Sequence, residues 1–265
     1  MRKMLTIAAV LLSATFLMGQ TWEIVREQSI SFNPADVYFF DAQNGVLVGG
    51  EGAIYLTTDG AKTLTPVIAA DPAVPNLADV HFADINNGFA VGDKGLILKT
   101  TDGGRNWIDV SDASVAVDLA GVAAISDQVA YVAGDDSTLL KTTDGGVNWV
   151  RSTYNFANAD LDGGIAFYDA DHGVVISDAN GGDAWYTTDG GANWNYSPLA
   201  GYFPLGTTSS RLYDIDAAGT TFVVVGYHRT TFISTDNGQS WVQSGPFSYG
   251  YDRNMSVDVI DDNTI

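Results

Sequence analysis

Cysteine is absent from the 265-residue chain, and basic side chains are scarce. Without cysteine there is no disulfide bond, no thiolate metal site and no cysteine nucleophile. Twelve Lys and Arg face 32 Asp and Glu, which gives a formal charge of −20. We expect no nucleic-acid partner, because phosphate binding depends on basic side chains. The three histidines (His81, His172 and His228) are too few for a multi-histidine metal site, so we expect neither a metal nor a cofactor.

Long apolar runs are also missing after the first twenty residues. Arg2 and Lys3 precede the apolar run Met4–Met18, and Gly19 follows it. This order is typical of a secretory signal peptide, and the run is short for a membrane span. The alternative is a buried N-terminal helix or strand. We predict a signal peptide over 1–19 and one domain over 20–265, on a protein that is secreted, periplasmic or held at the cell surface without a membrane span.

A repeated eight-residue segment organises the rest of the chain. It begins with Thr or Ser, has Asp two residues later, and in four copies ends in Trp. Its five Asp residues lie 43, 42, 45 and 47 positions apart: Asp59, Asp102, Asp144, Asp189 and Asp236. A period in the forties with short alternating strands is typical of the four-stranded blade of a β-propeller.

The remainder of each period also repeats. An apolar-alternating strand such as Asp79–Phe82 begins it, an Asn-Gly turn and a second apolar strand follow, and Gly92 has counterparts in three other repeats. We therefore predict an all-β propeller in which each repeat supplies strands a, b, c and d, with strand d opening at Trp107 and its equivalents.

The ends of the chain suggest how the ring is completed. Met255–Ile260 repeats the strand-a pattern, so five repeats and the opening strand of a sixth are visible, and we expect six or seven blades in a complete ring. Trp22–Val25 resembles the outer strand that closes such a ring. We interpret the chain as cut short at its C-terminus, which is consistent with the absence of a C-terminal sorting domain, with a compact five-bladed ring as the alternative.

The repeated segment matches the motif Ser/Thr-x-Asp-x-Gly-x-x-Trp, the Asp-box or bacterial neuraminidase repeat. Its Asp can accept hydrogen bonds from its own turn, its Gly adopts a conformation that a Cβ disfavours, and its Trp can pack between layers. We therefore predict structural roles, not catalytic ones, for Asp59, Asp102, Asp144, Asp189, Asp236, Trp107, Trp149, Trp194 and Trp241.

Binding is expected on the opposite end of the blades. The Asp-boxes are c–d turns, so the b–c turns and the linkers between blades form the other face. Its candidate binding residues are Tyr227, His228, Arg229, Tyr202, Phe203, Tyr249 and Tyr251. Exposed aromatic loop residues suit contact with peptides or sugars. The alternative is that the long linkers fold back over the rim.

Two more specific interpretations, a glycosidase site and a calcium site, have less support in the sequence. A glycosidase needs two carboxylates across a cleft, but with 29 Asp and 3 Glu such a pair can always be found. Calcium-like spacings at Asp160/Asp162 and Asp169/Asp171 do not continue into a known loop, so ordinary turns are the better interpretation. We assign no catalytic and no metal-binding residue.

The best repeats, Asp79–Trp107 and Gly121–Trp149, resemble the photosystem II assembly and stability factor propellers. This resemblance implies a non-enzymatic scaffold that binds a protein partner through a basic patch, whereas this chain is acidic. We predict a secreted, non-catalytic propeller that binds a protein or polysaccharide at the b–c turn face. The alternative is a sialidase-like or xyloglucanase-like hydrolase.

Overall fold

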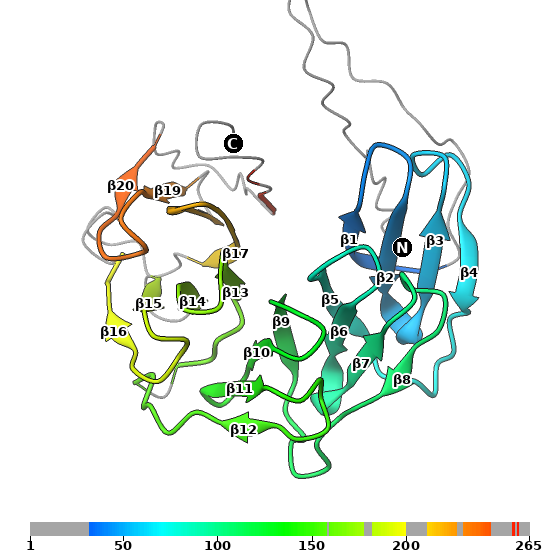
Figure 1. Cartoon of the computed structure of the whole chain (residues 1–265), viewed down its shortest axis with the longest axis horizontal. Coiled ribbons are helices and arrows are strands. Elements are labelled where there is room, and N and C mark those ends of the chain that lie inside the picture. The colour runs from blue at the N-terminus through cyan, green and yellow to red at the C-terminus, as the bar shows by residue number, and fades with distance from the viewer. Residues whose placement is uncertain are drawn as a thin grey trace, which may run out of the picture.

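The computed structural model describes residues 32–157, 159–177, 182–199, 211–226, 230–244, 256–257 and 259. These residues form five four-stranded antiparallel sheets in which each strand pairs with its neighbour in sequence. The five sheets follow one another around an arc (Figure 1). The predicted all-β architecture of four-stranded blades is confirmed, and we number the blades 1 to 5 in chain order.

The first three blades contain twelve strands. Blade 1 comprises β1 (Pro34–Phe39), β2 (Gly45–Gly49), β3 (Ile54–Thr57) and β4 (Thr65–Ile68). Blade 2 comprises β5 (Leu77–Phe82), β6 (Gly88–Gly92), β7 (Ile97–Thr100) and β8 (Ile108–Asp109). Blade 3 comprises β9 (Leu119–Ala124), β10 (Ala130–Gly134), β11 (Thr138–Thr142) and β12 (Val150–Arg151).

The last two blades repeat this order, and short 3-10 turns occur only between second and third strands among the described residues. Blade 4 comprises β13 (Gly164–Phe167), β14 (Gly173–Ser177), β15 (Asp183–Thr187) and β16 (Asn195–Tyr196). Blade 5 comprises β17 (Leu212–Ala218), β18 (Thr221–Gly226), β19 (Thr231–Ser234) and β20 (Val242–Gln243). The 3-10 turns are η1 (Gly50–Gly52) and η2 (Asp93–Gly95).

The second strand of every blade is buried along its whole length. Its sequences are GVLVG, GFAVG, AYVAG, GVVIS and TFVVVG. Such continuous apolar runs, rich in β-branched residues, are typical of strands covered on both faces. The hydrophobic core therefore lies between blades, where the second strand of one blade packs against its neighbours.

The glycine that ends this strand has a steric role. A Cβ on Gly92 would lie 1.9 Å from the carbonyl oxygen of Asn76, and the equivalent atom on Gly226 would lie 2.2 Å from that of Arg211. A side chain there would push the first strand away from the second. This close approach explains why the glycine recurs ten residues before the box Asp.

The outer strand differs slightly from the sequence prediction. In blades 2 to 5 it begins one residue after the Trp, at Ile108, Val150, Asn195 and Val242. The Trp backbone lies in the corner, outside the strand ladder, and the ring packs between layers. The predicted opening of strand d at Trp107 is therefore wrong by one residue.

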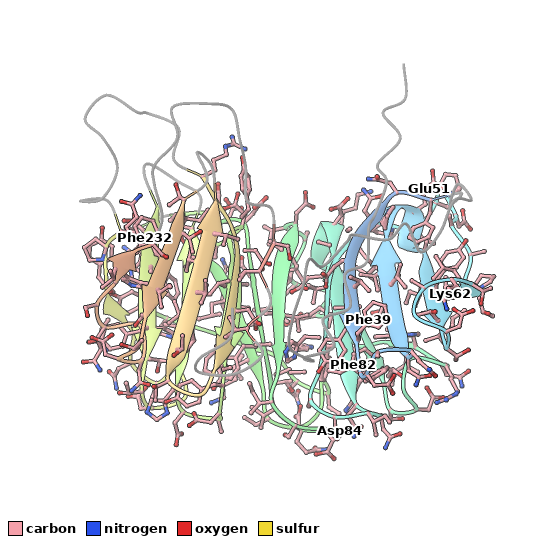
Figure 2. All side chains as sticks on the ribbon, turned by 90° about the horizontal axis from the view of Figure 1, so that it is seen from above. Phe39, Glu51, Lys62, Phe82, Asp84 and Phe232 are labelled. Carbon is pink, nitrogen blue, oxygen red and sulfur yellow. The ribbon has the colours of Figure 1, made fainter. Side chains whose placement is uncertain are left out.

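The two ends of the strands form two separate faces. Glu51, in the turn between β2 and β3, and Asp84, in the turn after β5, lie at opposite ends of the molecule (Figure 2). On the Asp84 side, the backbone N–H of Gly103 donates to Asn86 O at 2.9 Å, so the Asp-box corner is tied to the a–b turn of its own blade. We call this end the corner face and the other the b–c turn face.

Residues 256, 257 and 259 lie beside blade 5. Val257 and Val259 pack against its apolar face with Val223 and Val225. Their backbone N–H groups donate to side chains of β17, as described below. The predicted signal peptide (1–19) and the predicted closing strand (Trp22–Val25) lie outside the described residues, and the total blade number stays a prediction. Within the described ranges, no helix is long and apolar enough to cross a membrane.

Candidate functional site

Each Asp-box corner is held by the same four hydrogen bonds. The Thr or Ser hydroxyl donates to the Asp Oδ1 at 2.8–3.0 Å and accepts from the backbone N–H four residues after it at 2.8–3.0 Å. The Asp then accepts the backbone N–H four residues on at 2.8–2.9 Å and a side chain of that same residue at 2.6–2.7 Å. Both carboxylate oxygens are thus engaged within the turn.

These bonds also set the charge state of the corner. In blades 2, 3 and 4 the side-chain amide of the Asn four residues on is the largest cause that lowers the pKa of the box Asp: Asp102, Asp144 and Asp189. A carboxylate held ionised by its own turn is poorly suited to general acid catalysis. The geometry is that of a structural corner.

The corner of blade 1 keeps this network without the usual glycine. Ala61 stands where the other blades have Gly, and it adopts φ +64°. Its N–H nevertheless donates to Thr57 Oγ1 at 2.8 Å. The hydrogen bonds therefore hold a left-handed conformation that an alanine disfavours.

Lysines on third strands link neighbouring blades. Lys99 of β7 donates its Nζ to Asp127 O and Gly145 O of blade 3, both at 2.9 Å, and lies over the Phe89 ring. Lys141 of β11 donates in the same way to Gly190 O of blade 4 at 2.8 Å. Each ammonium therefore binds the backbone of the next blade's corner face.

Carboxylates on first strands make a second link between blades. Asp36 Oδ2 accepts the N–H of Val80 at 3.0 Å, and Asp79 Oδ2 accepts the N–H of Val122 at 2.7 Å. In each case the donor belongs to the first strand of the next blade. Blades 3 and 4 have Gly121 and Gly164 at this position, and a Cβ on Gly121 would lie 3.0 Å from the Gly164 Cα, so their first strands approach directly.

Blade 5 repeats the link toward Val257 and Val259. Asp214 Oδ2 accepts the N–H of Val257 at 2.9 Å, and Asp216 Oδ2 accepts that of Val259 at 2.6 Å. Donor and acceptor are 43 residues apart, as they are for Asp79 and Val122. These contacts place Val257 and Val259 where the first strand of a further blade is expected.

The first-strand carboxyls influence one another. Asp36, Asp79 and Asp214 are half-buried. Burial is the largest cause that raises the pKa of Asp79 well above its ordinary value, and the charge of Asp36 and a hydrogen bond with it add to the effect. Burial likewise raises the pKa of Asp36, and that of Asp214 to about 7. These buried carboxyls therefore keep their protons to higher pH than an ordinary Asp does.

The two described histidines have ordinary local partners. His81 Nδ1 accepts the N–H of Ala124 at 3.2 Å, and burial lowers the pKa of His81 to about 4. The imidazole is therefore neutral near pH 7, when it can act as an acceptor. His172 lies 3.0 Å from Asp169 in its a–b turn.

The b–c turn face is built from turns that the next blade caps. The N–H of Glu51 donates to Asn76 Oδ1, that of Lys94 to Asp118 Oδ1, and that of Asp136 to Asp160 Oδ1, each at 2.9 Å. Glu51, Lys94, Asp118, Asp136 and Asp160 are exposed on this face, and the Arg151 guanidinium donates to Asp136 O. Within the described part of the chain the Glu51 and Asp136 side chains accept no hydrogen bond, so this face presents free negative charge.

The predicted binding residues of this face are not placed by the structure. They lie outside the described residues: Tyr202, Phe203, Tyr227, His228, Arg229, Tyr249 and Tyr251. The calcium alternative gains nothing from the geometry, because Asp160 and Asp169 accept hydrogen bonds from turn N–H groups. Over the described ranges, no three His, Cys, Asp or Glu side chains are grouped as a metal site would require.

Sequence reasoning overlooked both kinds of link between blades. The sequence pattern marked three acidic residues only as polar residues at the start of first strands: Asp36, Asp79 and Asp214. It marked Lys99 and Lys141 only as residues close before the Asp-box Asp. The available signal was the period itself: a charged residue that recurs about 43 positions apart on a strand predicted to be buried needs a partner in the adjacent repeat.

Comparison with known proteins agrees with the repeat. Residues 67–156 match the family model for the photosynthesis system II assembly factor YCF48. A solved structure of YCF48 bound to a D1 peptide superposes with a TM-score of 0.59 at 21% identity, covering 84% of this chain and 69% of that one. The resemblance to the assembly-factor propellers is confirmed. A search of curated proteins finds no match.

Two glycoside hydrolase structures share the propeller fold. The GH74 xyloglucanase from Xanthomonas campestris gives a TM-score of 0.59 at 14% identity, covering 77% of this chain and 36% of the enzyme. An ancestral GH74 enzyme gives 0.57 at 15% identity, covering 76% of this chain and 30% of that one. The chain thus spans about a third of these enzymes, and identities this low establish the fold alone.

Proposed function

We propose, from the match of residues 67–156 to the YCF48 family model, that this chain is a non-catalytic propeller that binds a protein partner at its b–c turn face. One observation carries the proposal. The Asp-box carboxylates are engaged within their turns, and the first-strand carboxylates bind the backbone of the next blade, whereas Glu51 and Asp136 are exposed and free to meet a partner. The described charged groups therefore favour binding over acid–base chemistry.

The charge of this face suggests the chemistry of the partner. Glu51, Asp118, Asp136 and Asp160 outnumber Lys94 and Arg151, whose guanidinium donates to Asp136 O, on a chain of formal charge −20. Complementary charge steers association, so a basic peptide segment is the favoured partner. The peptide bound to the similar YCF48 structure supports a peptide over a sugar. Secretion through the predicted leader 1–19 remains part of the proposal.

Charge reversal on one face tests this function. The full chain is applied to an array of peptides that ranges from acidic to basic, at low salt and at about 0.5 M NaCl, where exposed charges are screened. We expect the chain to bind basic peptides, and we expect the higher salt concentration to weaken that binding. Glu51→Lys with Asp136→Lys should reduce it about tenfold or more. Asp171→Lys, an exposed change on the corner face, is the matched control and should leave it unchanged.

Two further measurements separate the alternatives. Tyr227→Ala, His228→Ala and Arg229→Ala together test the aromatic and basic patch predicted from the sequence, and unaltered binding would remove that patch from the proposal. Release of reducing sugar from xyloglucan or of sialic acid from a sialoside, abolished by one carboxylate change, would replace the binding function with hydrolysis.

A further inference from the structure

The outer half of blade 5, the last of the five sheets along the arc, carries an open groove (Figure 1). Six residues line it: Ile233, Thr235, Ser240, Val242, Gln243 and Ser244. Its volume is about 260 Å³. Ile233 packs with Val257 and Val259, so the groove is on the side that a further blade would follow. It lies apart from the b–c turn face and does not depend on the proposed function.

Blade 3 shows what lies against this part of a blade when another blade follows. Lys141, Val150 and Ser152 are its residues three positions before and six and eight positions after the box Asp, where blade 5 has Ile, Val and Ser. They line a smaller cavity together with Gly191 and Trp194 from the corner of blade 4. This side of blade 3 therefore receives the corner of the next blade.

All four corner Trp residues share a core cluster with the second strand of the preceding blade. The pairs are Trp107 with Val46, Trp149 with Phe89, Trp194 with Tyr131, and Trp241 with Val174. The hydrogen bonds of the indoles differ. Trp149 Nε1 donates to Val110 O of blade 2, whereas Trp107 Nε1 donates to Gly104 O of its own corner. The shared feature is therefore the packing of the ring against the preceding blade.

Two serines show what the incoming ring covers. Ser197 lies eight residues after the box Asp of blade 4, and its Oγ accepts the Nε1 hydrogen bond of Trp241 at 3.1 Å. Only 4% of Ser197 is exposed. Ser244 holds the same position in blade 5 and is exposed. In the part of the chain that the structure describes, blade 5 thus has the receiving side without a corner against it.

Ile233 indicates which kind of corner suits this groove. At the same position blades 2 and 3 have Lys99 and Lys141, and each Nζ donates to a backbone oxygen of the incoming corner at 2.8–2.9 Å. Isoleucine offers apolar contact only, so blade 5 depends on packing. A corner with Trp supplies a large aromatic ring for this purpose, whereas the corner of blade 1 has Leu64 at that position.

We propose that the groove of blade 5 binds a further Asp-box hairpin, one that is not part of blades 1 to 5, through the indole of its corner Trp. The ring lies against Ile233 and Val242 and covers Ser244. A cavity of about 150 Å³ takes up benzene, so a groove of about 260 Å³ has room for an indole. Burial of the aromatic ring removes about 150–250 Å² from water and supplies the affinity.

A cyclic peptide of residues 231–244 is the probe. The N–H of Ser244 donates to Thr231 O at 2.8 Å, so the two ends of this hairpin lie together and can be joined. Its Trp is replaced by 5-fluorotryptophan, and ¹⁹F NMR follows that one signal while the full chain is added. We expect the signal to shift and to saturate. The unlabelled peptide should displace the labelled one, and the unlabelled peptide with Trp241→Ala should not.

A matched pair of variants of the full chain locates the binding. Val242 is 70% exposed and Val150, at the same position of blade 3, is 68% exposed, so both tolerate substitution. Val242→Glu places a charge where the ring packs and should weaken binding about fivefold or more. Val150→Glu should leave it unchanged, because Trp194 already lies against that side of blade 3.

Three results would overturn the proposal. The first is a ¹⁹F signal that stays in place at about 1 mM chain. The second is equal affinity for the chain with Val242→Glu, which would place the peptide elsewhere. The third is binding only to the chain with Trp22→Phe, which would make Trp22 of the same chain the occupant of the groove.

Discussion

The Asp79 carboxylate accepts a hydrogen bond of 2.7 Å from the backbone N–H of Val122, a residue of the neighbouring blade. Asp36 makes the same bond to Val80, and Asp214 makes it to Val257. First strands of adjacent blades belong to different sheets and share no strand ladder. A side chain therefore satisfies a backbone group near the propeller axis that no sheet partner reaches.

Removing this bond should destabilise the propeller. Asp79→Ala leaves the Val122 N–H without its acceptor, and we expect the free energy of unfolding to fall by about 1–3 kcal/mol in urea titrations near pH 6. Asp79→Asn retains an acceptor, so its free energy of unfolding should be close to that of the unchanged protein. Asp127→Ala, an exposed position in the corner face, is the control. A loss no larger than that of the control would show that the bond contributes nothing.

The stability of this protein should fall as pH rises through the range where Asp214 ionises. Burial raises the pKa of Asp214 to about 7 in the folded chain, against 3.8 ordinarily. The folded state therefore holds a proton that the unfolded state has released, and the resulting stability, complete below 3.8, is lost as pH rises toward 7. The free energy of unfolding falls by at most about 1.4 kcal/mol per pH unit, and the partial exposure of Asp214 makes the fall smaller.

Asp214→Asn isolates this effect. The pKa of His81 is lowered to about 4, so His81 acts in the opposite direction between that value and its ordinary 6.5. Urea unfolding of both proteins at matched pH cancels that contribution. The difference in favour of the Asn variant should grow as pH rises toward 7. Parallel profiles would contradict a raised Asp214 pKa.

The buried lysine should matter more than an exposed one. Lys99→Met keeps the apolar stem but leaves Asp127 O and Gly145 O without the ammonium, so we expect a loss of about 1–3 kcal/mol. Lys62→Met changes an exposed side chain on blade 1 (Figure 2) and should shift stability by less than about 0.5 kcal/mol. Thermal unfolding of the two variants at equal concentration provides the comparison, and equal shifts would argue against the link between blades 2 and 3.

One substitution should stabilise the protein. Ala61 adopts φ +64°, so Ala61→Gly relieves a left-handed conformation, and a gain of about 0.5–1 kcal/mol is expected after the larger entropy loss of glycine. Ala192→Gly, at an exposed corner position of blade 4 without positive φ, lacks that relief and should be neutral or destabilising. A decrease in melting temperature for Ala61→Gly would mean that the corner bonds impose no strain.

Much of the fold could be predicted because each repeat carries its own local signals. The Thr-x-Asp-Gly corner fixes a turn through hydrogen bonds within five residues, and the apolar run of Gly88–Gly92 marks a strand covered on both faces. These features need no knowledge of distant parts of the chain. The one-residue error at Trp107 arose because packing of the ring, not the strand pattern, decides where the outer strand starts.

The contacts between repeats were less predictable for the same reason. Whether Asp79 faces solvent or the Val122 N–H depends on how two blades are placed, and the sequence of one repeat does not contain that information. Trp194 shows the limit most clearly: its motif matches that of Trp149, yet Trp149 Nε1 donates to Val110 O while Trp194 Nε1 has no acceptor among the described residues.

The carboxylate links of the first strands and the lysine links of the third strands share a direction. Where an Asp occupies the Asp79 position or a Lys the Lys99 position, its side chain reaches forward to the backbone of the segment that follows. The receiving group is a main-chain atom, so its identity does not depend on which residue occupies the position. A duplicated or deleted period would therefore meet a compatible neighbour at once, and a gene encoding this chain could lengthen or shorten by whole repeats without coordinated changes elsewhere.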